Sequence, residues 1–371
     1  MYINYAMKKT RALKPNTKKR KLSKTIYHLN SDTSATSENH DATIISNIVY
    51  TTSEIVECTL SLEQLIDSQP DTNKKLWINV HGVHDKNIIN AIGKKFNLHP
   101  LVIEDILNTE QRPKLDTYED YLFLETRNFY YESETMSVSS EQISIILGHG
   151  FLLTFQERST GAFEPIRERL RASRANIRDL GIDYLAYALI DNIVDRYFKA
   201  LEAMGDDAEK LEEALLSRPG NTELQGIHQL KHASIELRRS VWPLREVINN
   251  LTRNEANFFQ PATMPYLRDI YDHTVNFIES LEAIRDSLSG LMDIYMTSVS
   301  QRVNLELRAL TVVAMLFMPA TLIAGIFGMN FVHMPWIDHY NGFWYAIGIM
   351  VGIAFMMGLI FWRRQWLTSK G

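Results

Sequence analysis

The sequence is poor in the residues that build disulfide frameworks and nucleotide sites. Cys58 is the one cysteine among 371 residues, so a disulfide within the chain and a thiolate metal cluster are both excluded. No segment matches the phosphate-binding pattern GxxxxGK[ST] or the dinucleotide-binding pattern GxGxxG. The sequence therefore offers no support for a disulfide-rich domain or for these two nucleotide-binding classes.

Charged side chains are absent between Arg308 and Asp338. Within and beyond this stretch lie two apolar blocks, residues 309–327 and residues 343–362, of 19 and 20 residues. Each block is long enough to cross a hydrocarbon core of about 30 Å as a helix. The sequence thus predicts two transmembrane helices joined by a short loop over residues 328–342.

The loop between the predicted spans also lacks lysine and arginine, whereas both outer flanks carry them. Arg302 and Arg308 precede the first span, and Arg363 and Arg364 follow the second. Because basic residues remain on the cytoplasmic side, we expect a multi-pass cell-membrane protein with both termini in the cytoplasm. Residues 363–371 would form a cytosolic basic tail.

Acidic residues are missing from residues 1–31, which hold nine lysines and arginines. Residues 32–371 contain the remaining 30 basic residues and all 44 acidic ones, so their net charge is about -14. An acidic body attracts cations rather than nucleic acid. We expect residues 1–40 to be a disordered basic arm on anionic lipid. A nucleic-acid arm and a targeting peptide are the alternatives, but the segment lacks a signal peptide's apolar core.

The part before the membrane is predicted to be an α/β domain over residues 41–180, followed by a helical hairpin over residues 181–265. The hairpin has an acidic outer face on its first helix, residues 183–217, and a second helix at 222–250. That acidic face comprises Glu202, Asp206, Asp207, Glu209, Glu212 and Glu213. In the α/β domain, strands are predicted at 43–50, 76–80, 121–131, 142–147 and 151–156, and helices at 87–95 and 100–107.

Residues 266–308 read as one proline-free helix with apolar or small residues at alternating spacings of three and four, from Leu267 to Ser298. This heptad spacing is typical of a coiled-coil stalk. Because no capping signal separates it from the first span, residues 266–327 are predicted to form one rod of about 93 Å at 1.5 Å per residue. A rod of that length transmits movement between its ends.

Gly328, Met329 and Asn330 directly follow the first span. The surrounding sequence MPATLIAGIFGMNF, residues 318–331, resembles the signature of the CorA magnesium transporters, in which Gly-Met-Asn ends the pore helix. Three further motifs are similar to that family: HPLVIEDILN at 99–108, WPLRE at 242–246 and RDIYDH at 268–273. Taken in chain order, the four motifs extend the resemblance over roughly residues 45–367.

The resemblance implies an α+β membrane protein assembled as a homo-pentameric funnel in the bilayer. The expected function is a channel for hydrated divalent cations, chiefly Mg²⁺ with Co²⁺ and Ni²⁺ as further candidate ions, without enzymatic activity, organic cofactor or nucleic-acid partner. A zinc-transporting relative of the same architecture is one alternative, against which Met329 argues. A membrane-anchored coiled-coil tether without transport is the other.

Elementary ion chemistry supports a filter at the tripeptide. Mg²⁺ prefers six oxygens and gives up its water reluctantly, so a ring of neutral Asn330 amides can hold the hydrated ion without binding it tightly. Gly328 would permit close backbone approach or a positive φ. The alternative is an ordinary helix C-cap formed by Gly and Asn.

One face of the first span is small, polar or flexible, which suits a pore lining closed by apolar constrictions. Tight packing between helices through small residues is the alternative. The resemblance places constrictions at Asn304, Leu310 and Met318, although Leu310 lies one residue off the face. The face comprises Asn304, Leu307, Thr311, Ala314, Met318, Thr321, Gly325 and Gly328.

The resemblance also implies regulatory Mg²⁺ sites on the soluble domain. Asp105 and Asp269 would meet across a subunit boundary, and Glu104 and Asp191 would contribute to a neighbouring site. Asp293 is a candidate for an acidic ring at the inner pore mouth. Each of these acids, taken singly, also reads as a solvated surface acid or helix cap.

Two further features bear on metal binding. His81 and His84 have the i, i+3 spacing of a zinc pair, but no cysteine or third ligand lies nearby, which favours two hydrogen-bonded loop histidines. Residues 331–337, directly after the tripeptide, contain no acid, whereas many family members carry acids there. How cations would be recruited at the outer mouth is therefore open.

Overall fold

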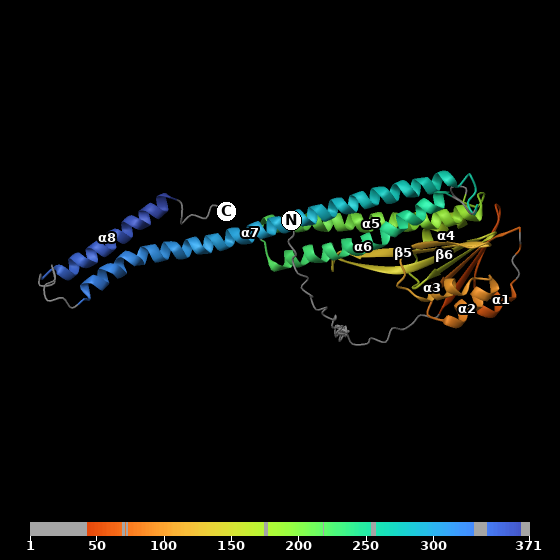
Figure 1. Ribbon diagram of the computed structural model, residues 1–371, viewed down its shortest axis with the longest axis horizontal. Helices are drawn as coiled ribbons and strands as arrows, with labels where there is room; N and C mark the ends of the chain where they lie inside the picture. The colour runs from red at the N-terminus through yellow and green to blue at the C-terminus, as the bar shows by residue number, and fades with distance from the viewer. Residues whose placement is uncertain are drawn as a thin grey trace, which may run out of the picture. The chain divides into compact units, whose positions relative to one another are not determined.

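A computed structural model describes residues 43–68, 71, 73–173, 177–217, 219–253, 257–329 and 340–364 (Figure 1). The predicted basic arm lies outside this part of the chain. The strands are β1 (Ile44–Tyr50), β2 (Ile55–Leu60), β3 (Lys75–His81), β4 (Lys114–Thr117), β5 (Tyr121–Glu132), β6 (Ser137–Gly148) and β7 (Phe151–Gln156). The helices are α1 (Leu62–Asp67), α2 (Lys86–Lys95), α3 (Pro100–Leu107), α4 (Glu164–Arg171), α5 (Ile182–Ser217), α6 (Asn221–Arg253), α7 (Met264–Phe327) and α8 (Gly342–Arg363).

The seven strands form one mixed sheet in the order β2-β1-β3-β7-β6-β5-β4. Every neighbouring pair is antiparallel except β3 and β7, which run parallel. The chain between this parallel pair supplies α2, α3 and the β4–β6 strands. Such a sheet with helices on both faces confirms the predicted N-terminal α/β domain.

Side chains alternate between two cores, one on each face of the sheet. On β3, Trp77 faces the core shared with α4, α5, α6 and α7, whereas Ile78 and Val80 face the core shared with α1, α2 and α3. Figure 1 shows the two helical layers on opposite sides of the strands. The acid-bearing helices α3 and α7 are therefore separated by the thickness of the sheet.

The predicted strands and helices in the α/β domain are present, but β2, β4, α1 and α4 were missed. Strand β2 is an exposed edge strand without the alternation of buried residues that marks a half-buried strand. Strand β4 has four residues, and α1 and α4 have six and eight. Strand β4 and helix α1 carry too few residues for a periodic signal, whereas α4 is as long as α3, which was predicted.

Helix α7 is 64 residues long and runs without interruption from the soluble core into the apolar C-terminal segment, which confirms the predicted rod. At about 1.5 Å per residue it spans about 96 Å. Its heptad seam, including Leu267, Phe277 and Leu291, is buried against α5 and α6 of the same chain. The seam therefore holds the rod to its own soluble domain and is not free to pair with another stalk.

Buried Asp183, at the start of α5, anchors the beginning of α7. Its Oδ2 accepts hydrogen bonds from the backbone N–H of Gln260 at 2.9 Å and from the hydroxyl of Thr263, the residue before α7, at 2.6 Å. The carboxylate is 2% exposed, so both bonds are shielded from water. The loop from α6 is thereby fixed where the long helix begins.

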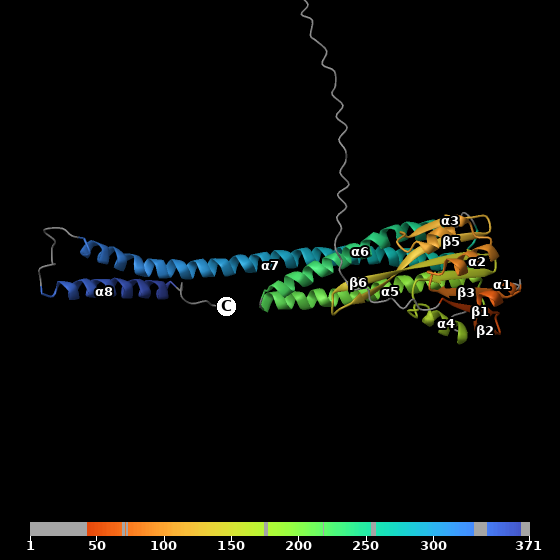
Figure 2. The same ribbon diagram turned by 90° about the horizontal axis from the view of Figure 1, so that it is seen from below.

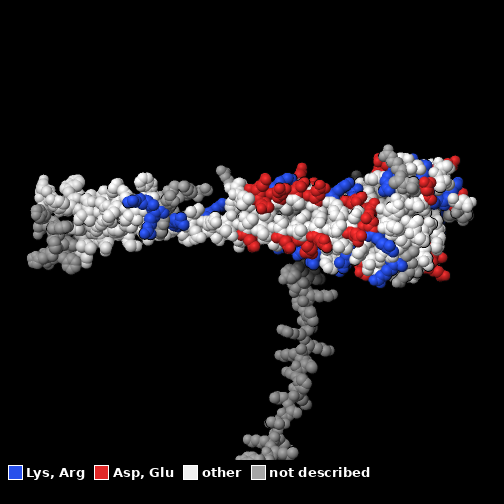
Figure 3. Space-filling view, turned by 90° about the horizontal axis from the view of Figure 1, so that it is seen from above, with Lys and Arg blue, Asp and Glu red and all other residues white. Residues whose placement is uncertain are grey.

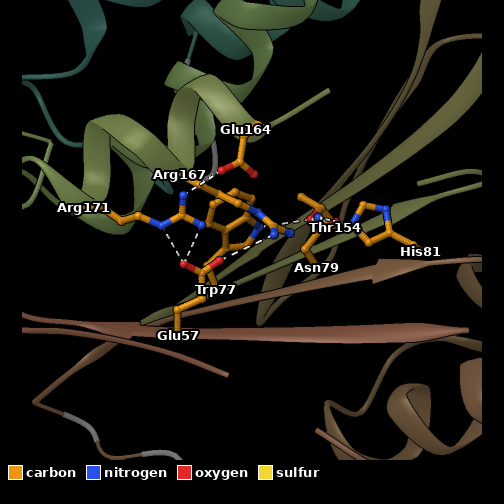
Figure 4. Close-up of polar contacts among 8 residues, drawn as sticks. All are labelled: Glu57, Trp77, Asn79, His81, Thr154, Glu164, Arg167 and Arg171. Atoms are coloured by element: carbon orange, nitrogen blue, oxygen red, sulfur yellow. Dashed lines mark hydrogen bonds and ion pairs between the residues drawn. The ribbon is translucent and has the colours of Figure 1, made fainter. Parts of the chain in front are cut away.

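Helix α4 is attached to the edge of the sheet by an ion-pair network (Figure 4). Glu57 of β2 accepts from Arg171 Nε at 2.8 Å and lies 3.5 Å from Arg167 Nη1, and Arg171 also pairs with Glu164. The Arg167 guanidinium lies 5.7 Å from the centre of the Trp77 ring. The exposed strand β2 is thus attached to α4 by ion pairs, which the sequence pattern of β2 alone does not predict.

One member of the predicted acidic outer face is not on the surface. Asp207 is 2% exposed; it accepts a hydrogen bond from the Tyr131 hydroxyl at 2.8 Å and pairs with Lys210 at 2.7 Å. The β5–β6 hairpin reaches α5 at this point and covers the carboxylate. The prediction was wrong for Asp207 because helical spacing alone does not show what a distant strand covers.

Glu125, in the middle of β5, is fully buried, and neither carboxylate oxygen has a hydrogen-bond partner among the residues that the structure describes. Burial raises the pKa of Glu125 from 4.5 to about 8. In the unfolded chain the group ionises near pH 4.5, so between pH 4.5 and 8 the folded state retains a proton that the unfolded state has lost. Stability contributed by the neutral acid is therefore complete below pH 4.5 and declines as the pH rises to 8.

We expect Glu125→Gln, which is neutral at every pH, to flatten this decline of about 1.4 kcal/mol per pH unit and to raise the melting temperature at pH 8.5. Thermal unfolding of the detergent-solubilised protein between pH 5 and 9 measures the effect. Glu213→Gln, at an exposed position on α5, serves as the charge-matched control. Parallel pH profiles for the wild type and Glu125→Gln would show that Glu125 is ionised in the folded protein.

Candidate ion pathway and metal-binding acids

Among the residues that the structure describes, the C-terminal part of α7 and the whole of α8 are long and apolar enough to cross a membrane. Only 6% of the apolar segment of each helix is buried within the chain. Figure 3 shows this end of the molecule almost free of charge, with Lys and Arg at its border and Asp and Glu along the helices beyond. An apolar surface this exposed requires lipid or further subunits to cover it.

Helix α8 packs beside the last part of α7 (Figures 1 and 2). The least exposed residues of that part of α7 form one stripe at helical spacing: Val312, Leu316, Pro319, Ala320, Ile323 and Phe327. The predicted pore face lies on the opposite side of the helix, and each of its residues is exposed. The helix pair therefore leaves uncovered the face that the sequence singled out, and Leu310, at 66% exposure, is uncovered as well.

A shallow groove of about 700 Å³ follows this open face. Four of its lining residues, Ala314, Met318, Thr321 and Gly325, belong to the predicted pore face. A Cβ added at Gly325 would meet no atom within 4 Å, so the glycine leaves space rather than filling a tight contact in this chain. Pro319, inside α7, removes one backbone hydrogen bond beside the groove.

Gly328 is the C-cap of α7, and its N–H donates to the carbonyl of Ala324 at 2.9 Å. Its φ is -85°, so of the two alternatives the positive φ is not adopted. A Cβ at this position would lie 3.1 Å from the Ala324 oxygen of the preceding turn. Met329 follows with 49% of its surface exposed, and Asn330 lies outside the described residues.

Asp191 of α5 and Asp269 of α7 lie on facing helices of the soluble domain. Burial raises the pKa of Asp191 to about 6, Asp195 adds to the rise, and the charge of Asp269 contributes further. His273, one turn after Asp269, has its Nε2 3.8 Å from the Asp269 carboxylate. Sequence reasoning missed Asp195 and His273, although each lies four residues from a predicted ligand on the same helix face.

Asp105 and Glu104 lie on α3, on the other face of the sheet. Glu104 is exposed and lines a shallow pocket of about 350 Å³. The carboxylate of Asp105 is 16% exposed; Gln111 Nε2 donates to its Oδ1 at 3.1 Å, and Lys114 Nζ contacts its Oδ2. Burial lowers the pKa of Lys114, but the hydrogen bond to Asp105 and the charges of the nearby carboxylates together outweigh burial, and the net shift is upward. Neither Gln111 nor Lys114 belongs to a predicted motif.

One chain does not bring the predicted regulatory acids together, because the sheet separates Asp105 from Asp269. Within the described part of the chain, no group of three or more His, Cys, Asp or Glu side chains is arranged to hold a metal ion. Asp293 is exposed on α7, although Ile294 and Tyr295 directly after it still pack against the soluble core. Any site that uses both Asp105 and Asp269 requires a second subunit.

His81 is held by hydrogen bonds rather than by the arrangement of a metal site (Figure 4). Trp77 Nε1 donates to Thr154 Oγ1 at 3.0 Å, and Thr154 donates to Asn79 Oδ1 at 2.8 Å. Asn79 Nδ2 lies 3.1 Å from His81 Nε2, and His81 Nδ1 lies 3.4 Å from the Arg158 carbonyl. Burial lowers the pKa of His81, which favours the neutral ring. The hydrogen-bonded interpretation is confirmed for His81, which lies at the end of β3.

The family model of the CorA-like Mg²⁺ transporter protein matches residues 72–364. The chain belongs to the CorA family. Across 297 residues it is 43% identical to the cobalt/magnesium transport protein CorA of Thermotoga maritima, with 80% of this chain and 85% of that protein covered. The putative metal ion transporter YfjQ of Bacillus subtilis is 32% identical, with 79% and 90% covered.

Solved structures share the CorA fold at lower identity. The CorA magnesium transporter of Methanocaldococcus jannaschii matches with a TM-score of 0.74 at 22% identity, covering 87% of this chain and 98% of that one. The cytoplasmic domain of ZntB from Vibrio parahaemolyticus matches with a TM-score of 0.55 at 14% identity, covering 70% and 98%. The α/β domain, the long helix and the two apolar helices are thus features of this family's fold.

Proposed function

We propose that this CorA-family chain forms a homo-pentameric channel in the cell membrane that conducts hydrated divalent cations, chiefly Mg²⁺ and also Co²⁺. Its relatives named as cobalt/magnesium transport proteins support the choice of ion, and the cover of 80% and 85% at 43% identity extends over both the soluble and the membrane part. With both termini in the cytoplasm, the loop between α7 and α8 lies outside, as the basic flanks indicate.

One observation carries the proposal: the predicted pore face of α7 is left open by α8. Thr311 and Thr321 within the span, and Asn304 just before it, give this exposed face polar groups that suit water better than lipid. The hydroxyls of Thr311 and Thr321 donate to carbonyls one turn earlier, at 2.7 and 2.9 Å, which leaves them acceptors for water. Five such faces around an axis would form a pore, with Leu310 and Met318 as apolar constrictions.

In this proposal the outer filter is a ring of Gly328, Met329 and Asn330. The C-cap at Gly328 ends the pore helix one residue before Met329, so the ring begins where the backbone leaves the helix. Neutral amide oxygens of Asn330 hold a hydrated ion by its water and release it again. The filter is thus selective for ions that retain their hydration shell.

Cytosolic Mg²⁺ is proposed to regulate the channel through acids on the soluble domain. Asp105 of one subunit and Asp269 of its neighbour supply hard oxygen ligands, and Glu104 and Asp191 form a second group nearby. A bound divalent cation supplies the charge that turns repulsion between these carboxylates into attraction. Neighbouring soluble domains are then held together, and each α7 keeps the pore face closed.

A zinc-transporting function is the second candidate, because the ZntB cytoplasmic domain shares the fold of the soluble part. At 14% identity that likeness extends to the fold alone. The two functions differ in the cation that passes, so reconstituted protein with dyes for Mg²⁺ and Zn²⁺ distinguishes them. The proposal requires a larger Mg²⁺ flux.

Asn330→Ala is expected to reduce Mg²⁺ uptake into dye-loaded liposomes by at least about tenfold, because the ring loses its hydrogen-bonding amides. Size-exclusion chromatography should show an assembly unchanged from the wild type. Asn341→Ala, at the other end of the loop, is the matched control and should retain flux. Wild-type flux through Asn330→Ala would remove the filter from the proposal.

Asp269→Asn is expected to shift Mg²⁺ inhibition of the current to higher concentrations by about fivefold, because the neutral amide weakens the intersubunit cation site. Patch recordings with Mg²⁺ on the cytoplasmic side measure the shift. Asp286→Asn changes the same charge at an exposed position further along α7 and should leave the inhibition curve in place. Equal curves for all three proteins would show that Asp269 is a surface acid without a regulatory role.

A further inference from the structure

The proposed regulatory ligand Asp105 already has a cationic partner within its own subunit. Lys114, the first residue of β4, places its Nζ against Asp105 Oδ2, and Gln111 Nε2 holds Oδ1 at 3.1 Å. Both oxygens of the carboxylate are therefore engaged. With only 16% of the Asp105 side chain exposed, a cation approaching Oδ2 meets the lysine ammonium first.

The position of Lys114 is fixed by three further contacts. Its backbone is paired with Glu125 across β4 and β5, and its Nζ lies 5.6 Å from the centre of the Phe123 ring. A second carboxylate, that of Asp116, lies 3.4 Å from Nζ. The ammonium is thus held at Asp105 rather than sampling solvent freely, although 32% of the side chain remains exposed.

We propose that Lys114 acts as a tethered competitor of the divalent cation at Asp105. Because the ammonium shares the chain with the carboxylate, its effective concentration there is high, and a cation has to displace it to reach Oδ2. This competition raises the Mg²⁺ concentration at which the regulatory site fills. The inference rests on the proposed regulatory role of Asp105.

The charges of this cluster fit such an exchange. With Lys114 in place, Asp105, Asp116 and the ammonium sum to one negative charge; once the ammonium moves into solvent, the two carboxylates present two negative charges to a divalent ion. Lysine suits this role because its ammonium is a single charge on a flexible stem that rotates away without breaking a bidentate pair. Asp116, 44% exposed and 3.4 Å from the ammonium, is the source of the second negative charge.

The test is a Mg²⁺ titration of the full-length protein in detergent, followed by limited proteolysis of the stalk and, separately, by the thermal shift. Lys114→Gln should lower the midpoint of Mg²⁺ protection about fivefold, the effect expected from removing a partly exposed ion pair. Lys114→Arg, which retains the charge and pairs bidentately, should raise the midpoint. Lys74→Gln removes the same charge from an exposed pair with Asp71 on the same domain and should leave the midpoint unchanged.

Opposite shifts of the Mg²⁺ midpoint in Lys114→Gln and Lys114→Arg support Lys114 as a competitor of the cation. Melting curves without Mg²⁺ show whether both variants are folded. A clear wild-type midpoint that neither variant moves would overturn this inference while leaving the proposed regulation intact. An equal shift in Lys74→Gln would also overturn it, since the effect would then come from net charge. Absence of Mg²⁺ protection in the wild type would overturn the proposed regulation itself, and the competitor with it.

Discussion

The structure depends on the continuity of α7, which runs as one helix through Pro319. Within one helix, Leu267 to Leu291 bury a heptad seam in the soluble core, and from residue 309 onward the same backbone carries an apolar segment with an open face. Each residue of a helix adds a hydrogen bond once the first turn has formed, so bending between the two parts costs free energy at every position. In the proposed regulation, movement of the soluble domain is passed along this helix to the membrane segment.

The remaining elements determine which end of that helix is held and which is free. Asp183 fixes the beginning of α7, and α5 and α6 bury its seam up to Leu291. Beyond this point no residue of α7 is buried until Val312, where α8 begins to cover it, although Arg302 reaches back to the carbonyl of Pro219 at 3.0 Å. The intervening stretch is the place where a rotation imposed by the soluble domain would pass to the pore face.

Sequence patterns predicted the parts of this account that depend on long periodic signals. The α7 seam, the two spans and the central strands follow from repeats that persist over many residues. Short elements such as β4, buried acids such as Asp207 and Glu125, and the partners of Asp105 depend on contacts between distant segments. Lys114 is nine residues from Asp105, and only the pairing of β4 with β5 brings it to α3. The intersubunit sites remain proposals, since a single chain holds only half of each.

A proline in the exposed stretch of α7 tests the central claim, that one continuous helix couples cation binding to the pore. Ser300→Pro removes one backbone hydrogen bond and adds a steric clash at a cost of about 3 kcal/mol, and Ser300→Ala is the matched control. Mg²⁺ protection of the soluble domain and Mg²⁺ inhibition of liposome flux are measured on the same preparation. We expect Ser300→Pro to retain protection at the wild-type midpoint and to lose inhibition. Inhibition at the wild-type concentration in Ser300→Pro would contradict coupling through the rod.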